Sequence, residues 1–325
     1  LTKIKTTSED QVGFKKTLTL ADNLFPTSFF KKEFFQSQNK PGLFIKPKHI
    51  KYPEILFVGH IDVVPAKPHQ FKPRKLGDKL FVRGAFDMKG PLAAMIMALL
   101  ESQKQYPNIS AGILFTSDEE NGGLAGVGTW VKKNKNHLPK IVFVPDGGNS
   151  LHLVTEEKGV LTLDVIVKGN SAHAARPWEG INAIEKAVEG IQLIKNKFPP
   201  LNNKTDWRTS MVITKLQTEN VGNQIPDKVT VHLNIRYIKK DSPKLILDAI
   251  QKCFPNQKIK IIKEAEALSI SIDSELVQLF LQSYKELLGH LPKIEKYSSC
   301  CDARFFSSHN IPAIIMRPEG NGSHG

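Results

Sequence analysis

Residues 55–66, ILFVGHIDVVPA, contain the stretch that decides the fold. The apolar run ILFV is typical of a strand buried in a sheet that helices cover on both faces. The run stops at Gly59. His60 follows it directly, and Asp62 comes two residues after His60. Open α/β sheets bind ligands beyond the carboxyl ends of their strands, so this imidazole and this carboxylate are candidates for a functional site.

Short apolar strands alternate with helical segments from this stretch to about residue 148. ILFV is followed by the helical GPLAAMIMALLESQKQ, the strand GILFTS, the helical VGTWVKKN and the strand KIVFVP. This alternation predicts an α/β fold with a mixed, mostly parallel sheet flanked by helices. Near the other end, SELVQLFLQSYKELLG predicts a helix and PAIIMRP predicts a buried strand that returns to the same sheet.

The segment between these parts has a different pattern. LTLDVIVKG, SMVITKL, KVTVHLNIRYI and KIKIIKEA predict strands, with the helical INAIEKAVEGIQLI after the first and SPKLILDAIQKC before the last. This β-α-β-β-α-β order is typical of a ferredoxin-like α+β unit. We therefore expect a discontinuous larger domain, residues 1–158 and 266–325, and a smaller domain, residues 159–265, inserted into it. Its first helix carries an apolar stripe suited to self-association, made of Ile181, Ile184, Val188, Ile191 and Ile194.

The composition argues against several classes of protein. The chain has 325 residues, of which 40% are hydrophobic, enough for a substantial core and about two domains. No apolar run reaches the length of about 18 residues that a transmembrane helix needs, so no membrane partner is expected. Three cysteines, Cys253, Cys300 and Cys301, argue against a disulfide framework and favour a cytoplasmic location.

The net charge of +13 raises the question of a nucleic-acid partner. The lysines are scattered, however, and no basic stripe with interleaved aromatic residues or known nucleic-acid motif accompanies them. We therefore expect no nucleic-acid partner. A basic surface that favours small anionic substrates is the better interpretation.

Further polar residues are placed as His60 is, just beyond a strand or before a helix. They are Asp87 in RGAFDMKG, Glu119 and Glu120 in SDEEN, Asp146 after IVFVP, and His324 after AIIM. We expect these side chains to converge at the carboxyl edge of the sheet. Such a group is unfavourable without a cation, because like charges repel and lose water.

Two divalent metal ions would stabilise this group of side chains. Mixed nitrogen and oxygen ligands suit zinc, with cobalt or manganese as alternatives. A carboxylate between two such ions bridges them. Asp62 would then hold the second ring nitrogen of His60, as residues behind a ligand histidine usually do.

Each residue also has a simpler explanation when it is taken alone. His60 would form a loop hydrogen bond, Asp87 would cap a helix, and Asp146, before two glycines, would be a turn residue. SDEEN would be a solvated acidic turn, and His324, in GSHG, would belong to an added tail. The coincidence of these placements in one strand order favours the metal site.

Six motifs, taken together, resemble those of a known family. They are GHIDVVP, GAFDMKG, SDEEN, PDGG, SAHAARPWEGINAIEK and NQIPDKVTVHLNIRY. In this order the chain resembles the M20 group of dinuclear metallohydrolases, which includes succinyl-diaminopimelate desuccinylase, acetylornithine deacetylase, carboxypeptidases and dipeptidases. The resemblance implies a zinc-peptidase-like catalytic domain with an inserted dimerisation domain, and a homodimer formed through residues 159–265.

The resemblance also implies a role for each site residue. Asp87 would bridge the two ions, and Glu119 would be the general base. The remaining metal ligands would be His60, Glu120, Asp146 and His324.

Three residues of the inserted domain would act on the substrate. By the resemblance, His173 of one subunit would reach the active site of the other, where its imidazole would stabilise the oxyanion. Asn223 and Arg236 would hold the carboxylate or amide of the substrate. The simpler alternatives are an exposed loop histidine for His173 and a surface salt bridge for Arg236.

One stretch departs from the family pattern. Desuccinylases usually have a glycine-rich segment similar to SGGTSDGRF, whereas this chain reads KYSSCCDARFF, keeping Asp302 and Arg304. Relatives also usually extend beyond both ends of the given sequence, so further chain is expected there. We expect metal-dependent hydrolysis of the amide bond of a small N-acyl amino acid. The alternatives are a dipeptidase or carboxypeptidase, and a catalytically silent relative.

Overall fold

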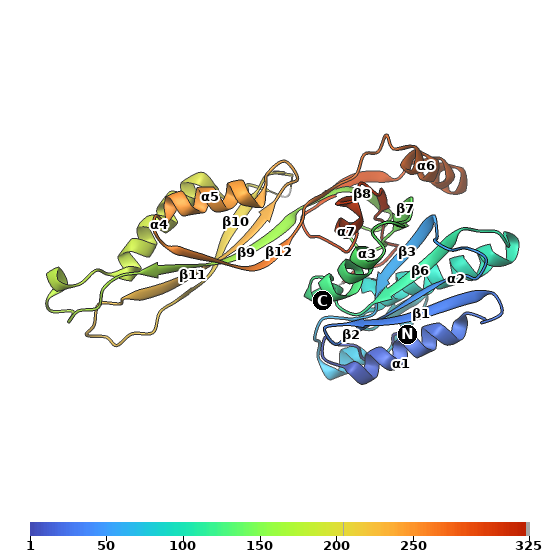
Figure 1. Cartoon of the computed structure of the whole chain (residues 1–325), viewed down its shortest axis with the longest axis horizontal. Helices are drawn as coiled ribbons and strands as arrows, with labels where there is room; N and C mark the ends of the chain where they lie inside the picture. The colour runs from blue at the N-terminus through green and yellow to red at the C-terminus, as the bar shows by residue number, and fades with distance from the viewer. Residues whose placement is uncertain (204, 323–325) are drawn as a thin grey trace. The chain divides into compact units, whose positions relative to one another are not determined.

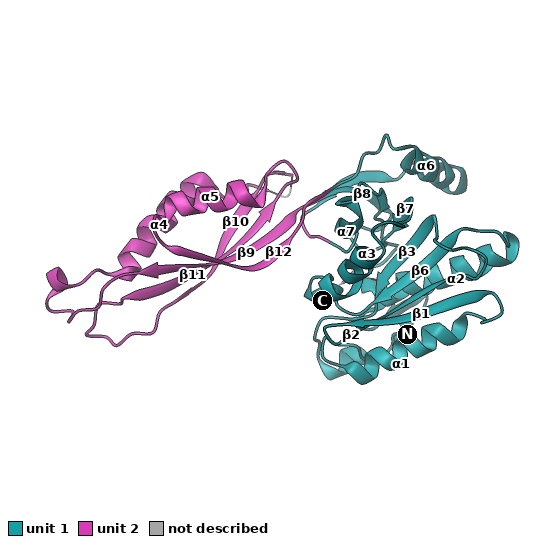
Figure 2. Ribbon diagram, viewed as in Figure 1, with its two compact units in different colours: residues 1–156, 269–297, 301–325 teal, residues 157–268, 298–300 magenta. Residues whose placement is uncertain are grey.

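The structure is a computed structural model that describes residues 1–203 and 205–322 (Figure 1). The chain divides into two compact units (Figure 2). Unit 1 comprises residues 1–156 and 269–297 and the described part of 301–325, and unit 2 comprises residues 157–268 and 298–300. Among the described residues, no helix has the length and apolar content needed to cross a membrane.

Unit 1 is built on a six-stranded sheet with the order β1-β2-β6-β3-β7-β15 (Figure 1). The strands are β1 (Phe30–Ser37), β2 (Lys40–Pro47), β3 (Ile55–His60), β6 (Ala111–Thr116), β7 (Ile141–Phe143) and β15 (Ala313–Ile314). The strands β6, β3, β7 and β15 pair parallel with one another, whereas β1 pairs antiparallel with β2, and β2 pairs antiparallel with β6. The predicted α/β class, with a mixed and mostly parallel sheet, is confirmed.

Helices cover both faces of this sheet. One core joins α1 (Gln11–Leu24) and α2 (Gly90–Gln105) to the sheet through Phe14, Leu92 and Ile45. On the other face Phe44 makes an edge-to-face contact with Trp130 of α3 (Thr129–Lys133), with ring centroids 5.2 Å apart. Because Phe44 and Ile45 are consecutive in β2, their side chains point to opposite faces.

The remaining elements of unit 1 are short or lie beside the main sheet. The longer helix is α6 (Glu275–Leu288), and α7 (Arg304–Ser307) is a single turn. A three-stranded sheet has the order β13-β8-β14, with β8 (His152–Glu157), β13 (Leu268–Ser269) and β14 (Lys293–Tyr297). A hairpin joins β4 (Arg74–Leu76) to β5 (Lys79–Phe81). Helical turns occupy Pro68–Phe71, Glu119–Asn121 and Leu124–Gly128, and the turn Ala85–Lys89 has non-helical backbone at Asp87 and Met88.

Unit 2 has the ferredoxin-like order that the sequence predicted. Its elements are β9 (Gly159–Lys168), the turn Pro177–Glu179, α4 (Ala183–Lys197), β10 (Ser210–Gln217), β11 (Lys228–Tyr237), α5 (Pro243–Cys253) and β12 (Lys258–Ala265). The strands pair antiparallel in the order β10-β11-β9-β12. Alternate residues of β11, including Val231 and Leu233, are fully buried, and Ile250 of α5 belongs to the same core.

Three of the five residues of the predicted apolar stripe, Ile181, Ile184 and Val188, lie outside this core, whereas Ile194 is fully buried in it. The helix α4 also buries its small residues, with Ala183, Ala187 and Gly190 inside. A Cβ atom on Gly190 would lie 2.2 Å from the ring of Phe254, so only glycine permits this close approach. Val188 is 45% exposed as a result, and Ile184 is similarly exposed.

Candidate metal centre

The buried strand β3 carries His60 to the carboxyl edge of the sheet. The strand lies between β6 and β7 and is parallel to both. Its last residue, His60, is only 1% exposed. A Cβ atom on the preceding Gly59 would lie 3.0 Å from side-chain atoms of Leu92 and Met95, so α2 packs tightly against this end of the strand. The imidazole is therefore held firmly at the strand end.

Asp62 connects His60 to the turn that carries the two glutamates. Its carboxylate accepts hydrogen bonds from the backbone N–H groups of Glu119, at 3.3 Å, and Glu120, at 3.0 Å. Its backbone oxygen lies 2.9 Å from Nδ1 of His60, and its Oδ1 lies 3.4 Å from the same nitrogen. When Nδ1–H donates to these oxygens, Nε2 is available as a ligand.

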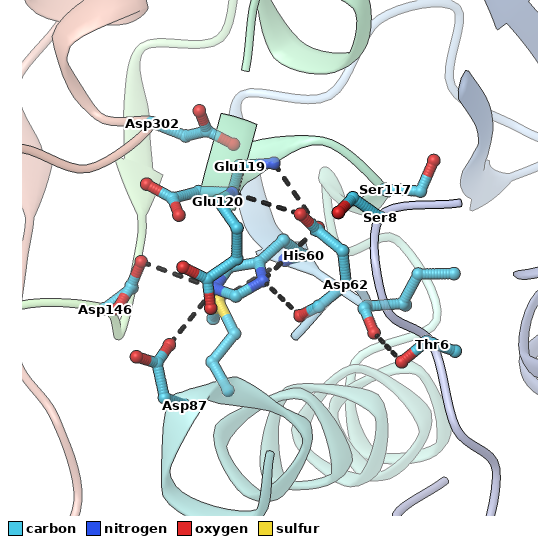
Figure 3. A network of polar contacts seen from close by, with 12 residues as sticks. Thr6, Ser8, His60, Asp62, Asp87, Ser117, Glu119, Glu120, Asp146 and Asp302 are labelled. Carbon is cyan, nitrogen blue, oxygen red and sulfur yellow. Dashed lines mark hydrogen bonds and ion pairs between the residues drawn. The ribbon is translucent and has the colours of Figure 1, made fainter. Parts of the chain in front are cut away.

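Two aspartates face this Nε2 atom (Figure 3). Oδ1 of Asp87, from the turn before α2, lies 3.2 Å from Nε2 of His60, and Oδ2 of Asp146, which follows β7, lies 3.5 Å from it. Ligand atoms of His60, Glu119 and Asp146 all lie within 4.8 Å of one another. Ligands bound to one zinc ion at about 2.0–2.2 Å are about 3–3.5 Å apart. The distances of 3.2 and 3.5 Å from Nε2 of His60 to the two aspartates match this spacing.

The histidine and the aspartate beside it have opposite pKa shifts. Burial would lower the pKa of His60, but hydrogen bonds to Asp146, Asp62 and Asp87 raise that pKa well above its ordinary value. Burial would raise the pKa of Asp146, but His60 and Arg317 hold it well below the ordinary range. Asp146 is therefore ionised at neutral pH and suited to binding a cation.

The two glutamates bind protons more tightly than ordinary carboxylates do. Burial, reinforced by Asp146 and Asp302, raises the pKa of Glu119 well above its usual value. Burial also raises the pKa of Glu120 to about 7. A general base that works near neutral pH needs a pKa above that of an ordinary carboxylate, and the raised pKa of Glu119 lies in this direction.

Two residues near the centre, Arg317 and Asp302, were not among the site residues predicted from the sequence. Arg317, which directly follows the segment AIIM, donates a hydrogen bond to Oδ1 of Asp146 and lies 3.4 Å from Oδ2 of Asp87. Asp302 is 2% exposed, and within the described part of the chain neither of its oxygens accepts a hydrogen bond. The signal for Arg317 was its position just after a buried strand, like that of His60 and Asp146.

The predicted substrate residues lie in unit 2. His173 is on an exposed loop, where its Nδ1 accepts a hydrogen bond from the N–H of Ala175 at 3.1 Å. Asn223 lies on the neighbouring loop, and its backbone oxygen accepts the N–H of Ala174 at 2.8 Å. Arg236, on β11, donates from Nε to Asn234 at 3.2 Å. The predicted ligand His324 lies outside the described residues.

Known proteins resemble this chain in sequence along most of its length. Residues 56–325 match the sequence profile of peptidase family M20/M25/M40. The chain is 26% identical over 318 residues to a succinyl-diaminopimelate desuccinylase of Helicobacter pylori, covering 92% of this chain and 81% of that protein. It is also 26% identical over 271 residues to a LysW-lysine/LysW-ornithine hydrolase of Sulfurisphaera tokodaii, covering 83% and 73% of the two chains.

Solved structures share the fold. An M20 family metallo-carboxypeptidase of Sulfolobus solfataricus superposes with a TM-score of 0.77 at 15% identity, covering 97% of this chain and 89% of that one. The aminopeptidase PepT of Bacillus cereus gives a TM-score of 0.74 at 19% identity, with 97% and 87% covered.

Proposed function

Because the chain belongs to peptidase family M20/M25/M40 and is a metal-dependent amidohydrolase, we propose that it hydrolyses the amide bond of a small N-acyl amino acid. The observation that carries the proposal is the convergence of Asp87 and Asp146 on Nε2 of His60, at 3.2 and 3.5 Å. The likeness to a desuccinylase over 92% of the chain supports an N-acyl amino acid as the substrate.

Divalent metal ions, most simply zinc, would be held by the carboxyl edge of the sheet. His60, Asp87 and Asp146 would hold one ion, and Asp87 would bridge to a second ion held with Glu120 and His324. Such ions polarise a carbonyl oxygen and lower the pKa of water towards neutrality.

Glu119 would move the proton in the reaction. Its carboxylate takes a proton from the attacking water while the oxygen of that water bonds to the carbonyl carbon. The carbon–nitrogen bond then breaks, and Glu119 delivers the proton to the departing nitrogen. Asp62 keeps this base in place, because its carboxylate holds the backbone N–H of Glu119 at 3.3 Å.

Unit 2 would supply the substrate contacts and the dimer interface. Arg236 and Asn223 would bind the substrate's carboxylate or amide, and His173 of one subunit would stabilise the oxyanion in the other. The exposed residues Ile184 and Val188 of α4 support a homodimer, because contiguous apolar surface of this kind often marks an interface.

A dipeptide is the second candidate substrate. With Asp302 and Arg304 aligned, Ser298, Ser299 and Ala303 stand where a segment similar to SGGTSDGRF has glycines. A side chain at such a position prevents the close approach of backbone and substrate that glycine permits. The pocket for the acyl group would therefore differ from that of a desuccinylase.

Hydrolysis assays on a defined panel test the function. The panel contains N-succinyl-diaminopimelate, N-acetylornithine and simple dipeptides, given to the zinc-loaded protein and to the chelator-treated protein. We expect metal-dependent release of amine from one class, and the preferred class decides between deacylase and dipeptidase. Bound zinc without turnover of any panel member would contradict the proposal and favour the silent relative.

A further inference from the structure

We propose that Arg317 is a positioning residue of the metal centre, which holds one oxygen of Asp146 so that the other oxygen faces the cation beside His60. The inference rests on the metal centre of the proposed function. Arg317 belongs neither to the six sequence motifs nor to the expected metal ligands.

The two carboxylates divide their oxygens between His60 and Arg317. The inner atoms, Oδ1 of Asp87 and Oδ2 of Asp146, lie 3.2 and 3.5 Å from Nε2 of His60. The outer oxygen of Asp146, Oδ1, accepts a hydrogen bond from Nη2 of Arg317. The outer oxygen of Asp87, Oδ2, lies 3.4 Å from the same nitrogen. Asp146 is thereby held as a ligand with one oxygen towards the ion.

Arg317 is itself fixed in place. The side chain is buried, with 5% of the residue exposed, and its guanidinium carbon lies 5.1 Å from the centre of the Phe86 ring. Its backbone oxygen accepts the N–H of Leu151 at 2.8 Å. A planar guanidinium is always charged and matches carboxylates geometrically, so it orients them better than an ammonium does. These contacts leave Arg317 little freedom to move away from Asp146.

The position of the charge also has an energetic consequence. Without an ion, Asp87 and Asp146 would be two buried carboxylates with His60 between them, an arrangement that like-charge repulsion opposes. Arg317 offsets part of this repulsion and keeps the ligands arranged as the ion requires. Residues that orient metal ligands in this way typically contribute about 10–100-fold to metal affinity.

A purely electrostatic role of Arg317 would have the opposite effect on metal affinity. A fixed positive charge next to the ligands repels a divalent cation, so its removal would tighten metal binding if repulsion outweighed positioning. The sign of the change in affinity therefore separates the two roles.

Metal affinity, measured without any assay of activity, tests the inference. The dissociation constant for Zn²⁺ is measured by competition with a chromophoric chelator for the unaltered protein, Arg317→Met and Arg317→Lys. Arg74→Met, at an exposed arginine of the hairpin strand β4, is the matched control. We expect about 10–100-fold weaker binding for Arg317→Met, a smaller loss for Arg317→Lys, and no change for the control.

Substituted Co²⁺ gives a second, spectroscopic measurement. Once freed, Asp146 is expected to bind through both oxygens, and the higher coordination number weakens the visible absorption of Co²⁺. Unchanged or tighter Zn²⁺ binding with an unchanged spectrum would overturn the inference.

Circular dichroism of the metal-free variants checks folding. If Arg317→Met does not fold, Arg317→Lys decides: weaker binding supports positioning, and unchanged binding overturns it. Failure of the unaltered protein to bind Zn²⁺ would instead contradict the proposed function.

Discussion

The carboxylate of Asp62 accepts the backbone N–H of Glu120 at 3.0 Å, across 58 residues of sequence. The same carboxylate also holds the N–H of Glu119, and Asp62 contacts Nδ1 of His60. One fully buried side chain thus fixes the histidine and the two glutamates relative to one another. Removing it should disturb all three.

Asp62→Ala is expected to lower both stability and metal affinity. The substitution leaves two backbone N–H groups without their acceptor, and a buried unsatisfied group costs about 1–3 kcal/mol. Urea unfolding of the metal-free protein measures the free energy of unfolding, and chelator competition measures zinc affinity. Asp62→Asn keeps the shape and one acceptor oxygen, so its loss should be smaller. Equal stability of Asp62→Ala and the unaltered protein would contradict this role.

Glu119→Gln and Glu120→Gln should separate the base from the ligand. If Glu119 moves the proton, Glu119→Gln keeps its metal content and loses at least about a hundredfold in kcat, the lower range for general-base catalysis. Glu120→Gln should instead lose bound metal. Elemental analysis and steady-state kinetics on the two variants form a matched comparison. Because Glu119 also lies within 4.8 Å of the ligand atoms of His60 and Asp146, metal loss in Glu119→Gln would reverse the assignment.

The metal-free protein should lose stability as the pH rises towards 7. Burial raises the pKa of Asp302 to about 7, whereas an unfolded aspartate titrates near about 3.9. A group with a raised folded-state pKa contributes its stability below the unfolded pKa and loses it as the pH rises through the folded value. Asp302→Asn removes this titration, so the fall in unfolding midpoint between about pH 4 and pH 7 should become shallower. An identical pH profile for Asp302→Asn would exclude Asp302 as its source.

Val188→Glu should weaken the proposed homodimer. The residue is 45% exposed on α4, so a charge there leaves the monomer's core intact but opposes burial at an interface. Analytical ultracentrifugation should show a shift from dimer to monomer. Lys195→Glu, at an exposed site on the same helix, is the control and should remain dimeric. A monomeric unaltered protein would remove the basis of the proposed role of His173.

Most of the fold prediction depended on the periodic spacing of apolar residues along the sequence. The ferredoxin-like order and the buried residues of β11 follow from period-two alternation, and that prediction is confirmed. The antiparallel pair β1 and β2 was not predicted. FKKEFFQS has mixed polarity on an edge strand, and its pairing with β2 depends on long-range contacts rather than on a local pattern.

The sequence by itself determined the order of the main elements from β3 to β7 and in unit 2, and the polar residues that follow the strands, because these depend on local periodicity and on the position of strand ends. It did not determine which residues complete the centre. Arg317 is 171 residues from Asp146 along the chain, and only the parallel pairing of β15 with β7 brings the two together. The hydrogen bonds of Asp62 with the backbone of Glu119 and Glu120 likewise depend on the packing of separate loops, which no local pattern encodes. Its contact with His60, two residues away, follows from the local motif.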